Sequence, residues 1–349
     1  MQRQYCFQSS EDGVSPIIGT VLILAIMVSI TGAMLAWGIP QIQQSEAYAI
    51  YTSSQNNFLN FDADIDRVLL QGTGASRSST VSFSSGTFVL RENLDEIRYY
   101  YTSVSWADPK LVGVKKGSTS FAIADTFASS VVSDYRVKLT YSNGTTWNGT
   151  TTSAVISGFP ELDYGTKAIY TSTDNETQIG GFFIYGTDSL SYKFASVSGM
   201  YKMRMFNGGI IAKEPGISFY MNSRPLIRSI DNASEITSFS LYQTDYNLSD
   251  SSRSLTAGNF NFDIRNQGGI DNSLNIYSLR MGFTGDSSTA LRTYFQSSWD
   301  FAPKNYYFSS KESIAASIMG TEEDISYSQD NPFDFRILER TLHVKFSIR

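Results

Sequence analysis

The hydrophobic positions divide the chain into three parts, of which the first is a long apolar run. No charged side chain occurs between Val14 and Ser45, and most residues of this run are apolar. A run of this length can cross a membrane as a helix. Pro16 suits the first turn of such a helix, whereas Pro40 is expected to kink or break it. We therefore predict a transmembrane helix over residues 14–40.

In the second part, apolar residues recur at spacings of three and four, which is typical of one apolar stripe along a helix. This stripe comprises Phe58, Phe61, Ile65, Val68 and Leu69. We predict an amphipathic stalk over residues 41–72, in which the helix resumes near Ala47, is loosened near residues 53–57 and ends at Gly72. The apolar face of the stalk should pack on the domain that follows.

The third part, residues 73–349, consists of short alternating segments separated by turn formers. The turns include Asn207-Gly208-Gly209 and Gln267-Gly268-Gly269, and their shared Gly-Gly-Ile also suggests a duplicated hairpin. Thr341–Ile348 alternates and is predicted to be the closing strand. Short helices are expected near residues 287–299 and 310–319.

These parts together predict an α+β fold. A long N-terminal transmembrane and amphipathic helix is followed by a large, mainly antiparallel β-sandwich domain over residues 73–349. Any internal boundary of that domain is placed near Phe159-Pro160, between two β layers.

Composition and charge exclude several classes of function. The net charge is −6, and no run of Lys or Arg is long enough to follow a phosphate backbone, so nucleic acid is not expected as a partner. Cys6 is the only cysteine, which excludes an intrachain disulfide and a thiolate zinc site. His343 is the only histidine, and we read it as an ordinary strand residue rather than as part of a catalytic triad. No cofactor is predicted, and we do not expect an enzyme.

Two acidic clusters are candidate metal sites. Asp62-x-Asp64-x-Asp66 resembles the start of a calcium loop, but Arg67 and Thr73 replace the glycine and glutamate that such a loop needs. A solvated helical face is the expected alternative. Glu322-Glu323-Asp324 is expected to be a hydrated loop, and no metal site is predicted.

Aromatic side chains could form a platform for sugars or belong to the core. The candidates are Tyr99, Tyr100, Tyr101, Trp106, Trp147 and Trp299. Packing in the core or on a sheet face is the expected role.

Small residues recur along one side of the apolar helix, and they are Ala25, Ser29, Gly32, Ala33 and Ala36. Such residues let two helices pack backbone to backbone. The alternative is that glycine and alanine are simply common in membrane helices.

The segment from Gly13 to Leu22, Gly-Val-Ser-Pro-Ile-Ile-Gly-Thr-Val-Leu, together with the apolar helix that follows, resembles the N-terminus of archaeal type IV pilins. The resemblance covers about the first 40 residues. It implies a leader over residues 1–13, cut by a prepilin-type peptidase between Gly13 and Val14. It also implies the signature positions Ser15, Pro16, Ile18 and Gly19. That family usually has a basic residue before the cut, where this chain has Glu11-Asp12.

Glycosylation sequons favour export of the β domain. They begin at Asn143, Asn148, Asn175, Asn232 and Asn247, all C-terminal to the helix. We expect N-linked glycans on loops of this domain, with the helix as a single-pass anchor and the bulk of the chain outside the cell.

The resemblance thus implies a structural subunit of an archaeal type IV pilus-like surface filament. The size of the chain favours a minor, tip or adhesive subunit over the main repeating one. The expected partners are the membrane, the prepilin peptidase and other pilin subunits, with surface glycans as a further candidate. The alternative is a membrane-anchored surface protein that does not polymerise and binds carbohydrate or a cell-envelope partner.

Overall fold

The computed structural model describes residues 16–105, 110–124, 135–151, 155–173, 176–232, 235–248, 254–285, 288–296, 309–310 and 323–348. The chain forms two compact units. The first comprises Met1–Ala49 with Ser196–Ser198, and the second comprises Ile50–Ala195 with Gly199–Arg349. The predicted leader, residues 1–13, lies outside the described residues.

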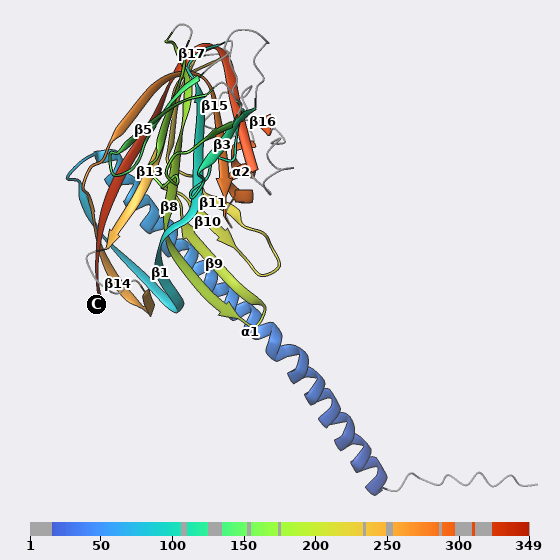
Figure 1. Cartoon of the computed structure of the whole chain (residues 1–349). Helices are drawn as coiled ribbons and strands as arrows, with labels where there is room; N and C mark the ends of the chain where they lie inside the picture. Colours follow the sequence, from blue (N-terminus) through green and yellow to red (C-terminus); the bar gives the residue numbers. More distant parts are fainter. Residues whose placement is uncertain are drawn as a thin grey trace, which may run out of the picture. The chain divides into compact units, whose positions relative to one another are not determined.

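One helix, α1, runs from Pro16 to Gln71 (Figure 1). Of the kink or break predicted at Pro40, the break was wrong, because the helix continues through this residue. Proline removes a single backbone donor, and the hydrogen bonds on either side hold the helix together. Gly72 ends the helix as predicted, with a φ of 89° that suits glycine.

The expected loosening of residues 53–57 was also wrong, because polar side chains in this segment bind the β-strands. Ser54 Oγ donates to the hydroxyl of Tyr192 over 3.1 Å. Asn57 Nδ2 donates to the backbone oxygen of Ser82 over 2.6 Å. The polar residues therefore attach this part of the helix to the sheet, and the helix is not loosened there.

The apolar stripe of the stalk was predicted correctly. Phe58, Phe61, Ile65 and Val68 are each 0% exposed. The ring of Phe61 lies 4.8 Å from that of Phe262, centroid to centroid, and the ring of Phe58 lies 5.8 Å from that of Phe88. Burial of such side chains contributes roughly 1.5–3 kcal/mol each, which holds α1 from Ile50 onward against the sheet.

The β region contains seventeen described strands and one further described helix. Their bounds are β1 Ser76–Thr102, β2 Lys110–Val112, β3 Ser120–Ala124, β4 Tyr135–Thr140, β5 Thr146–Thr151, β6 Val155–Ser157, β7 Lys167–Ser172, β8 Gln178–Ser196, β9 Gly199–Met205, β10 Ile210–Lys213, β11 Tyr220–Ser223, β12 Ile227–Asn232, β13 Glu235–Leu248, β14 Ser254–Asn266, β15 Asp271–Thr284, α2 Ser288–Gln296, β16 Ser309–Ser310 and β17 Glu323–Ile348.

Fourteen of these strands form one sheet, and β2, β3 and β6 form a small second sheet. The main path of the large sheet is β11-β10-β9-β8-β1-β14-β17-β13-β12. All described pairings are antiparallel except β13 with β17, so the predicted mainly antiparallel α+β fold is confirmed.

The strands are not divided into two large sheets, as the predicted sandwich would require. β1 pairs with β14 along its first part and with β15 along its last part, and β17 also pairs with both. At 27 and 26 residues, β1 and β17 are far longer than the usual five or six. Because each long strand changes partners along its length, it links groups of strands that shorter strands would leave separate.

The two glycine-rich turns differ in structure. Asn207 and Gly208 have φ values of 45° and 74° and form the tight β9–β10 hairpin turn, as predicted. Gln267-Gly268-Gly269 connects β14 to β15, which pair with β17 and not with each other, so the duplicated hairpin was wrong. The reason is that Gln267 and Gly268 hydrogen-bond to the backbone of Thr341, which keeps the segment along β17.

Two further predicted elements agree with the structure. Helix α2 lies within the range predicted as 287–299, and Thr341–Ile348 forms the end of β17. The second short helix was wrong at its start, because Ser310 lies in β16 and pairs with Ile325 of β17, and residues 311–319 lie outside the described residues. Phe159, beside the predicted internal boundary, is buried in a hydrophobic cluster of the β region.

Candidate functional site

The N-terminal half of α1 is apolar on every side. Four consecutive residues from Val21 to Leu24 are 55–65% exposed, and consecutive positions of a helix point in all directions. A helix of this kind belongs in a membrane or in the core of a larger assembly. In the described part of the chain, one helix is long and apolar enough to cross a membrane, with a mean hydropathy of 2.4 in its most apolar stretch.

Two of the hydroxyl groups in this half of the helix donate hydrogen bonds within the helix itself. Ser29 Oγ donates to the backbone oxygen of Ala25 over 2.7 Å, and Thr20 Oγ1 donates to that of Ile17 over 2.9 Å. A hydroxyl group without a partner is costly in hydrocarbon. These contacts therefore make the surface of the helix compatible with lipid.

The predicted small-residue positions share one side of α1. At 3.6 residues per turn, they fall within an arc of about 100°. A Cβ atom added at Gly32 would meet no other atom within 4 Å, so the backbone is open to close approach there. The members of this small-residue face are Ala25, Ser29, Gly32, Ala33 and Ala36, and all are exposed.

The pilin signature positions lie at the start of the helix. Pro16 is the first residue of α1, Ile18 is exposed and Gly19 is half-exposed. Gly13, Val14 and Ser15 lie outside the described residues.

The sequons are placed in a turn and on strands. Asn143 lies in the β4–β5 turn, where its Oδ1 accepts a hydrogen bond from the backbone N–H of Thr145 over 2.9 Å. Asn148 and Asn247 are exposed on β5 and β13, and Asn232 is the last residue of β12. Asn175 lies outside the described residues. Only Asn143 of the described four therefore has the expected loop position.

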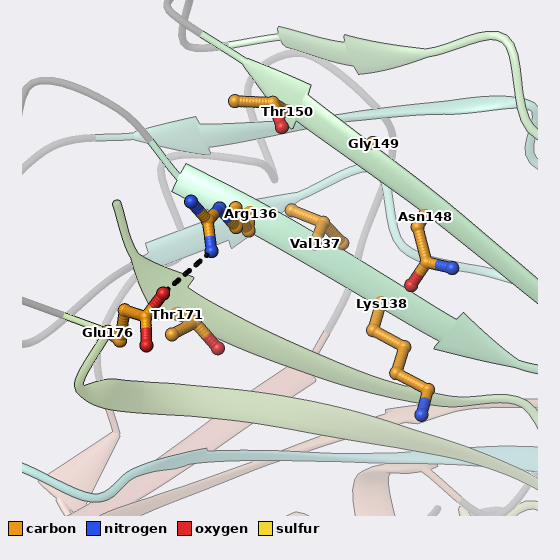
Figure 2. A pocket seen from close by; sticks show the side chains of 8 residues that line it. All are labelled: Arg136, Val137, Lys138, Asn148, Gly149, Thr150, Thr171 and Glu176. Atoms are coloured by element: carbon orange, nitrogen blue, oxygen red, sulfur yellow. Dashed lines mark hydrogen bonds and ion pairs between the residues drawn. The ribbon is translucent and has the colours of Figure 1, made fainter. Parts of the chain in front are cut away.

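A shallow polar hollow of about 570 Å³ lies over β4, β5 and β7 (Figure 2). Arg136 Nη1 lies 3.2 Å from Glu176 Oε1 within it, but both side chains are largely exposed. An exposed pair of this kind contributes at most about 1 kcal/mol. Lys138 and Asn148 pair across β4 and β5 along the same hollow, so polar side chains surround the sequon at Asn148.

The acidic residues of the stalk differ from the predicted solvated face. Asp62 is only 3% exposed, and burial, followed by the nearby Asp66, raises the pKa of its carboxyl group to about 8. Burial also raises the pKa of Asp66 to about 7, although Arg224 acts in the opposite direction. Asp62 follows Phe58 by four residues and Asp66 follows Asp62 by four, so both continue the buried face. Only Asp64 forms surface ion pairs, including one of 2.6 Å to Arg77.

No metal site is formed by the described residues. Among them, no group of three or more histidine, cysteine, aspartate or glutamate side chains is placed to hold a metal ion. Glu323 and Asp324 begin β17 and do not form the expected loop, and Glu322 lies outside the described residues. His343 is half-buried in the same strand, paired in register with Arg265 and Asn247.

The described aromatic candidates belong to the packed interior. Tyr99, Tyr100 and Tyr101 are 2–5% exposed and contribute to clusters on the two faces of the sheet. Trp147 packs edge-on against Phe159, with the ring centroids 5.5 Å apart. Trp106 and Trp299 lie outside the described residues. Core packing is therefore confirmed for the tyrosines, and a sugar platform built from them is excluded.

Buried ion pairs were missed from the sequence. Arg204 Nη1 lies 3.4 Å from Asp95 Oδ2, and both side chains are about 5% exposed. Arg98 is 0% exposed and donates through Nη1 to the backbone oxygen of Val114 over 3.0 Å. The signal for Arg98 was its position between Ile97 and Tyr99-Tyr100-Tyr101. Such a run of consecutive large residues favours a strand buried on both faces, which leaves no solvent-exposed side for the arginine.

The chain was compared with known protein families, curated proteins and solved structures. No curated protein and no solved structure matches the chain. Residues 13–174, slightly less than half of the chain, match the model of a family of unknown function, DUF7289. This range covers all of α1 and the strands β1–β7. The N-terminal helix and the strands that follow it are thus similar to this family.

Proposed function

We propose that the chain is a structural subunit of a surface filament of the archaeal type IV pilus kind. One observation carries the proposal. The N-terminal half of α1 is exposed and apolar on every side, yet it belongs to the same unbroken helix whose C-terminal half packs on the β domain. Such a helix can act first as an anchor in lipid and later as a packing element between subunits.

During assembly, the apolar helix would exchange its contacts with lipid for contacts with the helices of other subunits. Removal of the hydrophilic residues before Val14 frees the apolar helix to leave the bilayer lengthwise. Lipid tails are as apolar as the helix itself, so hydrophobicity does not favour the exchange. Shape does, because a face built of Gly32, Ala33 and Ala36 lets two helix backbones approach closely.

The β domain would then form the outer surface of the filament. Its described sequons at Asn143, Asn148 and Asn247 are exposed, as glycan acceptors must be. A domain of this size is suited to a minor, tip or adhesive subunit.

The acidic Glu11-Asp12 before the proposed cut favours a second candidate, in which the leader is retained. The chain would then be a signal-anchored surface protein that does not polymerise. N-terminal sequencing of the native protein separates the two candidates. A start at Val14 supports the filament subunit, and a start at Met1 or Gln2 rules it out.

Cross-linking tests the assembly step directly. Cys6 leaves with the leader, so the mature chain would contain no cysteine and a single introduced thiol reports on one position. Gly32→Cys and Ala36→Cys should give disulfide-linked dimers in sheared surface filaments. Met34→Cys is the matched control, because it lies about 150° around the helix from the centre of the small-residue face. Equal cross-linking at Met34 would exclude packing through that face.

A further inference from the structure

A second hollow, with a volume of about 830 Å³, lies over strands β12, β13 and β17. Arg228 of β12 pairs in register with Ser240 of β13, which pairs in turn with Arg336 of β17. Neighbouring strands are about 4.8 Å apart, so the two arginine Cα atoms are separated by roughly 10 Å. A short side chain between two long ones leaves a trough, and we call it the arginine trough.

The next row of the sheet continues this arrangement. Ser238 of β13 lies in register with Asp334 of β17, again placing a short hydroxyl side chain in the floor. Asp334 Oδ2 is held by Nε of Arg336 over 2.5 Å, and its Oδ1 accepts from Ser273 over 2.6 Å. The carboxylate of Asp334 is thus engaged by its own neighbours and orients the guanidinium of Arg336.

The charge of the trough is positive on a protein whose net charge is −6. Its lining includes Arg224, Arg228 and Arg336 against Asp66 and Asp334. Arg228 is exposed and forms no ion pair with any residue that the structure describes. Burial raises the pKa of Asp66 to about 7, so part of its population carries no charge at neutral pH. The three arginines therefore outnumber the two carboxyl groups of this open hollow, and Arg228 faces it without an ion-pair partner among the described residues.

We propose that the arginine trough binds an acidic saccharide, which is a sugar bearing a carboxylate or sulfate group. Guanidinium groups bind such oxyanions through paired N–H donors, and Arg228 and Arg336 flank the floor at the two sides. Ser238 and Ser240 supply hydroxyl groups for the sugar ring. The volume is in the range of sites for small molecules, roughly 300–1,000 Å³, and favours a short saccharide over a protein surface.

This inference rests on the proposed exposure of the β domain at the cell surface, but its test does not require a filament. The full-length chain in detergent micelles is titrated with glucuronate, with a sulfated disaccharide and with neutral glucose, and heat release is measured. Binding of the two charged probes, weakened by salt, is expected, with no binding of glucose. The comparison of the two charged probes identifies the preferred oxyanion.

Variants locate the site. Arg228→Gln and Arg336→Gln should each weaken the binding of the charged probes about tenfold or more, since a charged hydrogen bond contributes about 1.5–3 kcal/mol. Both side chains are exposed, so thermal unfolding and circular dichroism should stay unchanged. Arg136→Gln, in the other hollow, is the matched control and should bind as the wild type does.

Three results would overturn the proposal. The first is the absence of heat at probe concentrations up to about 10 mM, because a specific site would bind the probe more tightly than that. The others are equal binding of glucose and unaltered affinity in both trough variants. Preferential binding of an acidic peptide would assign the trough to a protein partner and would equally refute the saccharide. A mature start at Met1 together with trough-dependent binding would reject the filament and retain the site.

Discussion

The hydroxyl group of Ser54 on α1 lies 3.1 Å from that of Tyr192 on β8 and donates a hydrogen bond to it. Both side chains are buried, at 1% and 0% exposure. Tyr192 in turn donates to the backbone oxygen of Ser85 over 2.6 Å. A chain of two hydrogen bonds therefore links the helix, β8 and β1 at a point where the sequence pattern predicted a loose segment.

Tyr192→Phe should destabilise the β domain by about 1–3 kcal/mol. The substitution keeps the ring but leaves the buried hydroxyl of Ser54 and the carbonyl of Ser85 without this partner. Urea unfolding followed by circular dichroism measures the loss. Tyr48→Phe is the control, because Tyr48 is 57% exposed and should change stability little. Equal stability of the two variants would show that the hydrogen-bond chain contributes nothing.

The buried carboxyl group of Asp62 predicts a pH dependence of unfolding. Its pKa is raised from 3.8 to about 8 in the folded chain, so between these values the folded state retains a proton that the unfolded state has lost. Stability should therefore fall as pH rises from about 4 to about 8, by up to about 1.4 kcal/mol per pH unit for this group. Asp62→Asn should flatten the slope and be more stable than the wild type at pH 8.

The control for this pH series is Asp64→Asn. It removes surface ion pairs to Arg67 and Arg77, and pairs of this kind contribute at most about 1 kcal/mol. Urea midpoints measured at several pH values should shift slightly and in parallel with those of the wild type. An unchanged slope in Asp62→Asn would exclude Asp62 as the source of the pH dependence.

Two glycines with the same kind of backbone conformation should respond differently to alanine. At Gly208, with a φ of 74°, a Cβ atom would lie 2.6 Å from Asp66 Oδ1 and 2.8 Å from Leu226 Cβ. At Gly74, with a φ of 87°, it would meet nothing within 4 Å. Gly74→Ala should cost only the left-handed strain of about 1–2 kcal/mol, and Gly208→Ala about 3 kcal/mol or more. Equal losses in urea unfolding would contradict the close approach at the β9–β10 turn.

A lysine in the apolar half of α1 should prevent stable insertion in a membrane. Ile26→Lys places a charge near the centre of the apolar run, at a cost of about 2.5–3.5 kcal/mol. The protein should then be extracted from membranes by alkaline carbonate, whereas the wild type stays with the lipid. Leu70→Lys, at an exposed position in the last turn of the same helix, should behave as the wild type does. If both lysine variants stayed with the membrane, this result would argue against an anchor in this segment.

The features that could be predicted from the sequence are those set by local spacing. Phe58, Phe61 and Ile65 follow a helical period, and their burial was predicted correctly. A two-residue hairpin turn of this type requires positive φ at both central residues, and Asn207 and Gly208 adopt such φ values. In both cases the physical cause lies within a few residues of the chain.

The features that were missed depend on distant partners. Asp62 is buried because the β domain packs over its side of the helix. Arg98 is buried because its strand is covered on both faces. The arginine trough is a further case, since residues 228, 240 and 336 become neighbours only through strand register. Spacing along the chain carries no information about such pairings.

The position of β17 in the sheet has a consequence for the kinetics of folding. Along the main path of the sheet, β12 and β13 are joined to β14 and β1 only through β17, although β17 follows all of them in the chain. Ribosomal synthesis therefore delivers both flanks of the sheet before the strand that joins them. Because most of its pairings span long stretches of sequence, the domain should fold slowly and late, and its unpaired edges are open to aggregation until that strand has docked.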